Sequence, residues 1–171
     1  METSFQVGGV FRVEHIRDGK VIDEWESKNI VTDEGLNHML NATLHGTTQV
    51  STWYIGLFEG NYTPVAGNTM AAFPAAATES IAYNEATRVE WDEADDGATA
   101  KVITNGTGTG ATKATFTITA TKTMYGAFLA SSSAKSATTG TLFAASRFAA
   151  PRAVVANDQL LITYTVQAQS S

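Results

Sequence analysis

Residues 159–169, QLLITYTVQAQ, alternate between large apolar side chains and mostly polar ones. Leu160, Ile162 and Tyr164 would share one face of an extended strand, with threonines on the opposite face. This two-residue period is typical of a β-strand that buries one face. Residues 113–131, KATFTITATKTMYGAFLAS, show the same alternation. The two segments together predict a protein built mainly from β-strands.

The N-terminal segment, about residues 4–28, predicts a β-hairpin. Asp18 and Gly19 lie between two strand-like runs, and this dipeptide favours a type I′ turn, in which both central residues adopt positive φ. Gly8 and Gly9 predict a bulge or bend within the first strand.

One segment is helical in pattern, residues 29–46, NIVTDEGLNHMLNATLHG. Thr32 or Asp33 can cap a helix over about residues 33–45, and Gly46 is a suitable residue to end it. All other periodic segments resemble strands at hairpin-like spacing. We therefore expect an antiparallel β-sandwich, jelly-roll-like in topology, with this single helix.

The 171-residue length suits a single domain with a real core. Residues 51–60, STWYIGLFEG, predict a buried strand. Residues 60–80 carry two of the three prolines and little periodicity, so we expect a long loop excursion there, with at most a short helical turn.

A helical wheel divides the predicted helix into an apolar and a polar face. The apolar face carries Leu36, Met39, Leu40 and Leu44, and the polar face carries Glu34, His38 and His45. We expect the apolar face to close one side or end of the sandwich. The polar face would then lie in solvent or against a neighbouring subunit. The two histidines are about 10 Å apart along the axis, too far to share one metal ion.

Composition excludes several functional classes. The formal net charge of −6 argues against binding to nucleic acid, which requires a basic surface. The absence of cysteine excludes disulfides, thiol catalysis and thiolate metal sites. No apolar run approaches the roughly 20 residues that span a bilayer, so we expect no membrane partner. The first residues lack the pattern of a signal peptide, which favours synthesis in a cytoplasm-like compartment.

No motif predicts a catalytic, cofactor or metal residue. The acidic turn Asp92–Gly97 resembles a calcium loop only in part, because Ala94 and Ile103 occupy ligand positions. We expect a charged hairpin turn there, with a weak cation site as the alternative. Residues 106–113, GTGTGATK, lack the spacing of a phosphate-binding loop. His15 has no obvious serine or aspartate partner in the sequence. We expect no enzyme activity.

Tryptophan and tyrosine residues admit more than one interpretation. They could belong to the core, to an interface between subunits or to a sugar-binding platform. Core or self-interface is the favoured interpretation, and carbohydrate binding is the alternative. The residues concerned are Trp25, Trp53, Trp91, Tyr54, Tyr62 and Tyr83.

Three segments in this order resemble a known group of proteins: KNIVTDEGLNHML (28–40), TWYIGLFEG (52–60) and FAASRFAAPRAVVANDQLLITYTV (143–166). The chain resembles small structural proteins of tailed bacteriophages, and among these most closely the head-decorating, or cement, proteins with a jelly-roll-like sandwich. The shared motifs are packing motifs, so the resemblance implies no catalytic residues.

The resemblance implies a cement protein on the capsid surface of a virion, made in the host cytoplasm during assembly. Its implied partners are the major capsid protein and further copies of itself, as a dimer or trimer. Residues 1–5 and 60–80 are candidate arms for such contacts. The candidate interface residues are Met1, Phe5, Trp53, Tyr62, Pro64, Met70 and Phe73. The alternatives are a tail tube, baseplate or fibre component and, less favoured, a carbohydrate-binding module.

Overall fold

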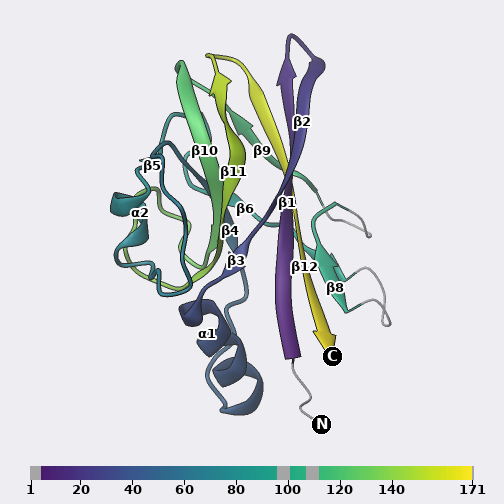
Figure 1. Ribbon diagram of the computed structural model, residues 1–171, viewed down its shortest axis with the longest axis vertical. Coiled ribbons are helices and arrows are strands. Elements are labelled where there is room, and N and C mark those ends of the chain that lie inside the picture. Colours follow the sequence, from purple (N-terminus) through teal and green to yellow (C-terminus); the bar gives the residue numbers. More distant parts are fainter. Residues whose placement is uncertain (1–4, 96–100, 107–111, 171) are drawn as a thin grey trace.

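The computed structural model describes residues 5–95, 101–106 and 112–170, in which two antiparallel β-sheets pack face to face (Figure 1). The prediction of a mainly β sandwich is confirmed. In sheet A, the central parts of β1 and β12 bury every second residue, whereas the last five residues of β10 in sheet B are all buried. Each sheet thus presents an apolar face to the other. The main core lies between the sheets and includes Phe11 and Phe116, both fully buried.

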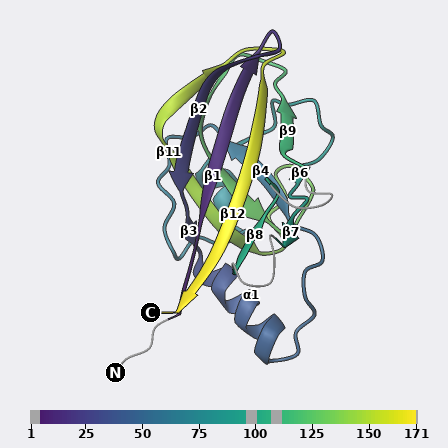
Figure 2. The same cartoon turned by 90° about the vertical axis from the view of Figure 1, so that its right-hand side faces the viewer.

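Sheet A joins the first strand of the chain to the last. Its strands are β1 (Phe5–Arg17), β2 (Lys20–Lys28), β7 (Ala94–Asp95), β8 (Val102–Thr104), β9 (Ala114–Thr117) and β12 (Gln159–Ser170). The order is β2-β1-β12-β8-β7, and β9 also pairs with β12. β1 and β12 are in register from Phe5 opposite Ser170 to Ile16 opposite Gln159. The start of β1 and the end of β12 therefore lie side by side, and they extend beyond sheet B (Figures 1 and 2).

Sheet B forms the other layer. Its strands are β3 (Ile30–Val31), β4 (Tyr54–Phe58), β5 (Glu79–Ser80), β6 (Val89–Glu90), β10 (Lys122–Ala130) and β11 (Leu142–Val154). The order is β3-β11-β10-β4-β5, and β6 also pairs with β4. β4 confirms the strand predicted within residues 51–60.

The N-terminal hairpin is confirmed, but its irregularity lies elsewhere than predicted. Asp18 and Gly19 adopt φ of 52° and 75°, as a type I′ turn requires. The bulge predicted at Gly8-Gly9 is wrong, because β1 pairs with β12 without a break there. The register shift instead separates His15 from Ile16 opposite β2.

Residues 60–80 form a folded cover rather than an extended arm. They contain the short helix α2 (Phe73–Ala76) and pack on the outer face of sheet B (Figure 1). Phe73 makes edge-to-face contacts with Phe58 of β4 and Phe128 of β10. A second apolar cluster results, so the excursion is stabilised by burial and is not free to reach a neighbour in this conformation.

The predicted helix is α1 (Asp33–Leu44), at one end of the sandwich (Figure 1). The Oγ1 atom of Thr32 accepts a hydrogen bond from the Gly35 amide at 3.0 Å, and Gly46 follows the helix with φ of 73°. The Thr32 hydroxyl also donates to the carbonyl of Leu142 in β11. A side chain at Gly35 would collide with the backbone of Phe143, so glycine permits the helix to touch the sheet.

Candidate interaction surfaces

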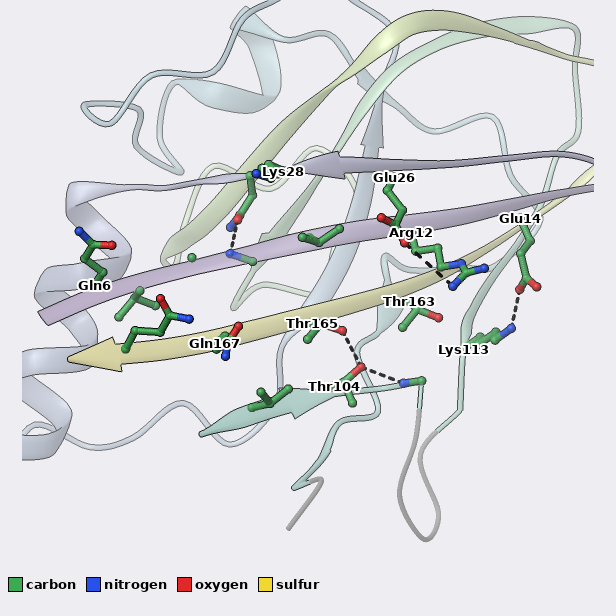
Figure 3. A pocket seen from close by; sticks show the side chains of 18 residues that line it. Gln6, Arg12, Glu14, Glu26, Lys28, Thr104, Lys113, Thr163, Thr165 and Gln167 are labelled. Carbon is green, nitrogen blue, oxygen red and sulfur yellow. Dashed lines mark hydrogen bonds and ion pairs between the residues drawn. The ribbon is translucent and has the colours of Figure 1, made fainter. Parts of the chain in front are cut away.

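A broad polar hollow lies on the outer face of sheet A (Figure 3). Its volume is about 850 Å³. The outward residues of β1 and β12 form its floor, because every second side chain of a strand points away from the core. The residues of these two strands that line it include Gln6, Gly8, Val10, Arg12, Glu14, Thr163, Thr165, Gln167 and Gln169.

The side chains around this hollow carry both signs of charge. The Arg12 guanidinium lies 3.8 Å from the Glu24 carboxylate, and Lys113 Nζ lies 2.6 Å from Glu14 Oε2. Toward the termini the charges give way to hydroxyls and amides. There Thr104 and Thr165 share a hydrogen bond of 2.9 Å between their hydroxyls. No aromatic residue is among the described residues that line the hollow.

A second hollow is apolar and lies between α1 and the part of sheet A that extends past sheet B. Its volume is about 710 Å³. We call it the α1 groove. Met39 and Ala42 line it from the helix, and Ile103 and Val166 line it from β8 and β12. It remains open because sheet B ends before β1 and β12 do (Figure 1).

The orientation predicted for α1 is wrong. Glu34 faces the protein, where its Oε2 atom accepts hydrogen bonds from the amides of Met70 at 2.9 Å and Leu142 at 2.7 Å. Leu40 and Leu44, expected to close the sandwich, are 51% and 79% exposed. We infer that the two hydrogen bonds accepted by Glu34 stabilise this orientation of α1 by more than the burial of Leu40 and Leu44 would.

The two histidines of α1 have different surroundings. His38 is half-buried, and its ring packs edge-on against Trp53 at a centroid distance of 5.7 Å. The expectation that His38 lies in solvent is therefore wrong, and the alternative of a neighbouring subunit stays a prediction, since His38 lines the α1 groove. His45 is exposed, as expected, and caps the helix C-terminus through its backbone amide, which donates to the carbonyl of Asn41.

Two of the three tryptophans are buried, and the third is half-buried. Trp25 is 8% exposed and lies beneath the Arg152 guanidinium, and Trp91 is 4% exposed and donates its indole N–H to the carbonyl of Tyr164. Trp53 is half-buried and lines the α1 groove beside Phe143. The favoured interpretation of core or interface fits these positions better than a sugar platform, which needs a flat exposed ring.

The candidate interface residues lie in different places. Phe5 is 61% exposed on the extended part of β1. Tyr62 and Pro64 are half-buried at the surface of the 60–80 cover, where the Tyr62 ring contacts Phe73. Met70 and Phe73 are fully buried, so the structure assigns them to the core of the cover and not to an interface. Trp53 lines the α1 groove. Met1 lies outside the described residues.

His15 has an aspartate partner that the sequence did not reveal. Its Nε2 atom lies 2.8 Å from Asp158 Oδ2, and the Arg17 guanidinium donates to both oxygens of the same carboxylate at 2.7 Å. These hydrogen bonds from Arg17, with further ones from the Val155 amide and His15, hold the pKa of Asp158 well below its usual range. Because His15 is 4% exposed, this cluster is a structural anchor between two hairpins rather than a site that substrate reaches.

A second buried ion pair joins the loops around sheet B. Arg88 is 1% exposed, and its Nε and one terminal nitrogen donate to the two oxygens of Glu79 at 2.8 Å and 2.7 Å. Two further N–H groups donate to the carbonyls of Ser132 and Ala137. Four of the five guanidinium N–H groups are thus used within the protein, which fits a structural role.

Acidic and histidine side chains are scattered over the described part of the chain. Among the residues that the structure describes, no three His, Asp or Glu side chains gather in a group that could hold a metal ion. Asp92 of the acidic turn accepts a hydrogen bond from the Thr112 hydroxyl at 2.8 Å. Asp96 and Gly97 of the same turn lie outside the described residues. Within the described residues, no helix has the length and apolar character needed to cross a membrane.

Neither a scan against protein-family models nor a search of curated proteins matched this chain. Its function must therefore be inferred from its own surfaces. The sequence indicated neither hollow, because the polar one depends on the pairing of four strands and the α1 groove depends on where two sheets end. Alternation in residues 159–169 did place Thr163 and Thr165 on the face opposite Leu160, Ile162 and Tyr164, and both threonines line the polar hollow.

Proposed function

We propose that the chain is a capsid cement protein that binds the major capsid lattice through the polar hollow of sheet A. The observation that carries this proposal is the breadth and mixed polarity of that hollow. It spans β2, β1, β12 and β8, and it combines charges of both signs with hydroxyls and amides (Figure 3). The resemblance of three sequence segments to head-decorating proteins also favours a cement protein.

The chemistry of the hollow suits a protein surface better than a small substrate. Contacts between separately folded proteins are about as polar as ordinary surface and rely on hydrogen bonds and paired charges. A sugar-binding face would be expected to offer an exposed aromatic ring, and the described lining of this hollow has none. A carbohydrate-binding module is accordingly not the favoured function.

The proposed mechanism is mass action. A protein that binds only the expanded shell stabilises that shell by an amount that grows with the concentration of free protein. Catalysis plays no part in this role. The protein would assemble in the host cytoplasm and remain on the capsid surface of the virion, as a dimer or trimer.

The direct test is binding to expanded heads prepared from phage that lack this gene. We expect the wild-type protein to co-sediment with such heads and to raise the temperature at which they rupture. Arg12→Glu should abolish both effects, because Arg12 lies within the hollow and its side chain is 56% exposed. Lys20→Glu, the same charge change at the exposed hairpin turn, is the matched control and should bind normally.

Three results would contradict the proposal. One is a wild-type protein that fails to bind expanded heads. Another is a labelled copy that electron microscopy finds only on tails, which would favour the tail-associated alternative. Equal binding by Arg12→Glu and the wild type would show that the polar hollow is not the contact.

A further inference from the structure

Leu40 and Leu44 lie exposed on the face of α1 that is turned away from the protein, and the half-buried Leu36 precedes them by one turn. Leu36, Leu40 and Leu44 recur every four residues, so they form a stripe about 12 Å long. Leu40 is 51% exposed and Leu44 is 79% exposed. Exposed leucines are ordinary when they are scattered, but a contiguous row on one helix face marks a contact surface.

The α1 groove lies on an adjacent face of the same helix. Met39 and Ala42 line the groove and are about 100° and 160° around the helix from the centre of the leucine stripe. The stripe therefore cannot fill the groove of its own molecule. Each molecule presents an apolar ridge and an apolar groove side by side, and neither is covered by the described part of the chain.

Charge favours a second copy of this chain as the occupant. Among the described residues that line the groove, the ionisable ones are His38 and Lys101, and none of these lining residues carries a carboxylate. Asp33 is exposed and lies on the same face of α1 as the leucines. A second copy would bring its leucine stripe to the apolar walls and its Asp33 toward Lys101. Two molecules of net charge −6 associate most readily through surfaces that hold few acids.

We propose that copies of this chain associate by docking the Leu36–Leu40–Leu44 stripe of one molecule into the α1 groove of another. This is a helix-in-groove contact with anchors one turn apart. The leucine stripe and the α1 groove are adjacent on each molecule. In a dimer with a two-fold axis, each stripe would therefore lie in the partner's groove, which gives two identical contacts. In a cyclic trimer, each molecule would place its stripe in the groove of the next. Apolar contacts of this kind are typical of homo-oligomers. The inference goes beyond the proposed function, because it holds whether or not a shell is the further partner.

The test is sedimentation velocity of the purified full chain over a dilution series. The wild type should sediment as a dimer or trimer. The double variant Leu40→Ser, Leu44→Ser removes most of the leucine stripe. It should weaken association by roughly a hundredfold, because two leucine side chains would no longer be buried on association. Ile81→Ser, at a residue that is 58% exposed outside the groove and the stripe, is the matched control and should assemble normally.

A groove variant separates this arrangement from other ways of pairing. Ala42→Trp, or Thr43→Trp if the first fails to fold, fills the groove while it leaves the leucines in place. It should be monomeric alone. When this groove variant is mixed with the Leu40→Ser, Leu44→Ser protein, the two should form a complex. The groove variant still has its leucine stripe, and the double-serine variant still has an open α1 groove. Circular dichroism and thermal melting confirm that each variant is folded.

Charge reversal gives a third measurement. Asp33→Lys and Lys101→Asp should each weaken association, and the double variant should restore it. A monomeric wild type would overturn the proposal, and so would full assembly of the double-serine variant. Wild-type assembly by a folded groove variant would also overturn it, because the leucine stripes would then be pairing with each other.

Discussion

Arg88 and Asp158 are buried and charged, yet each has hydrogen-bond partners on several segments of the chain. Asp158 joins β1 to the β11–β12 turn, and Arg88 joins the segment before β6 to the loop after β10. Burying a charge is costly unless it is paired and hydrogen-bonded. These residues therefore fix how loops and hairpins meet. At the residue scale the ionisable groups of the interior serve the fold, and the candidate contacts belong to the surface.

Asp158 should make the stability of the protein depend on pH in acid. Its folded pKa lies below the unfolded value of about 3.9, so its contribution is complete above that value and is lost as pH falls toward the folded pKa. We expect Asp158→Asn to lower the free energy of unfolding at pH 7 by about 1–3 kcal/mol, because the Val155 amide and His15 lose their charged acceptor. Urea unfolding between neutral pH and pH 2 measures both effects.

The variant should also lose less stability than the wild type over the acid range. Asp18→Asn is the matched control, since Asp18 lies in the exposed hairpin turn and asparagine tolerates its positive φ. Parallel acid curves for the wild type and Asp158→Asn would show that another carboxylate carries the pH dependence.

At the scale of single elements, α1 shows what a local pattern can and cannot predict. Its beginning and end follow from Thr32 and Gly46, whose capping roles need only neighbouring residues. Its orientation does not follow, because the acceptor that Glu34 provides is used by amides 36 and 108 positions away. A helical wheel compares only the residues of the helix itself, so it cannot show that amides elsewhere in the chain need the Glu34 carboxylate as an acceptor.

The two sides of α1 should respond differently to substitution. Glu34→Ala leaves the amides of Met70 and Leu142 without this acceptor in a half-buried position, so we expect a loss of roughly 2 kcal/mol or more in the free energy of unfolding. Leu44→Ala, at the most exposed apolar side chain, should change it by less than about 0.5 kcal/mol. Thermal unfolding at low protein concentration compares the two variants. A larger loss of stability in Leu44→Ala than in Glu34→Ala would support the orientation that the helical wheel predicts.

At the scale of the whole molecule, the protein has two neighbouring hollows, one lined mainly by polar residues and the other mainly by apolar residues. The polar hollow lies on the outer face of sheet A, and the α1 groove lies at the end of the sandwich. Val7, Val102 and Gln167 line both, so the proposed contact with a shell and the proposed contact with a second copy would lie side by side. Interfaces between identical subunits are more apolar than contacts between independently stable partners, which matches the assignment of the two hollows.

Salt should separate the two associations. Raising ionic strength from about 0.1 M to 1 M shortens the screening length from about 10 Å to 3 Å. Binding to heads through the charged part of the polar hollow should weaken over this range, and self-association through leucines should persist. Co-sedimentation with heads and sedimentation velocity of the free protein measure the two separately. A parallel loss of both would mean that one surface serves both contacts.

The sequence by itself determined the class of fold, the N-terminal hairpin and its turn, the limits of α1 and the strand at residues 54–58. Each of these depends on residues close together in the chain, through side-chain periodicity, backbone dihedral preference or capping. Only the tertiary structure decided that residues 60–80 cover sheet B, that Asp158 is the partner of His15, and that Leu40 and Leu44 face outward. Each of these depends on hydrogen bonds or packing between distant segments. The candidate surfaces belong to the second group, because a hollow exists only where separate strands and a helix are brought together.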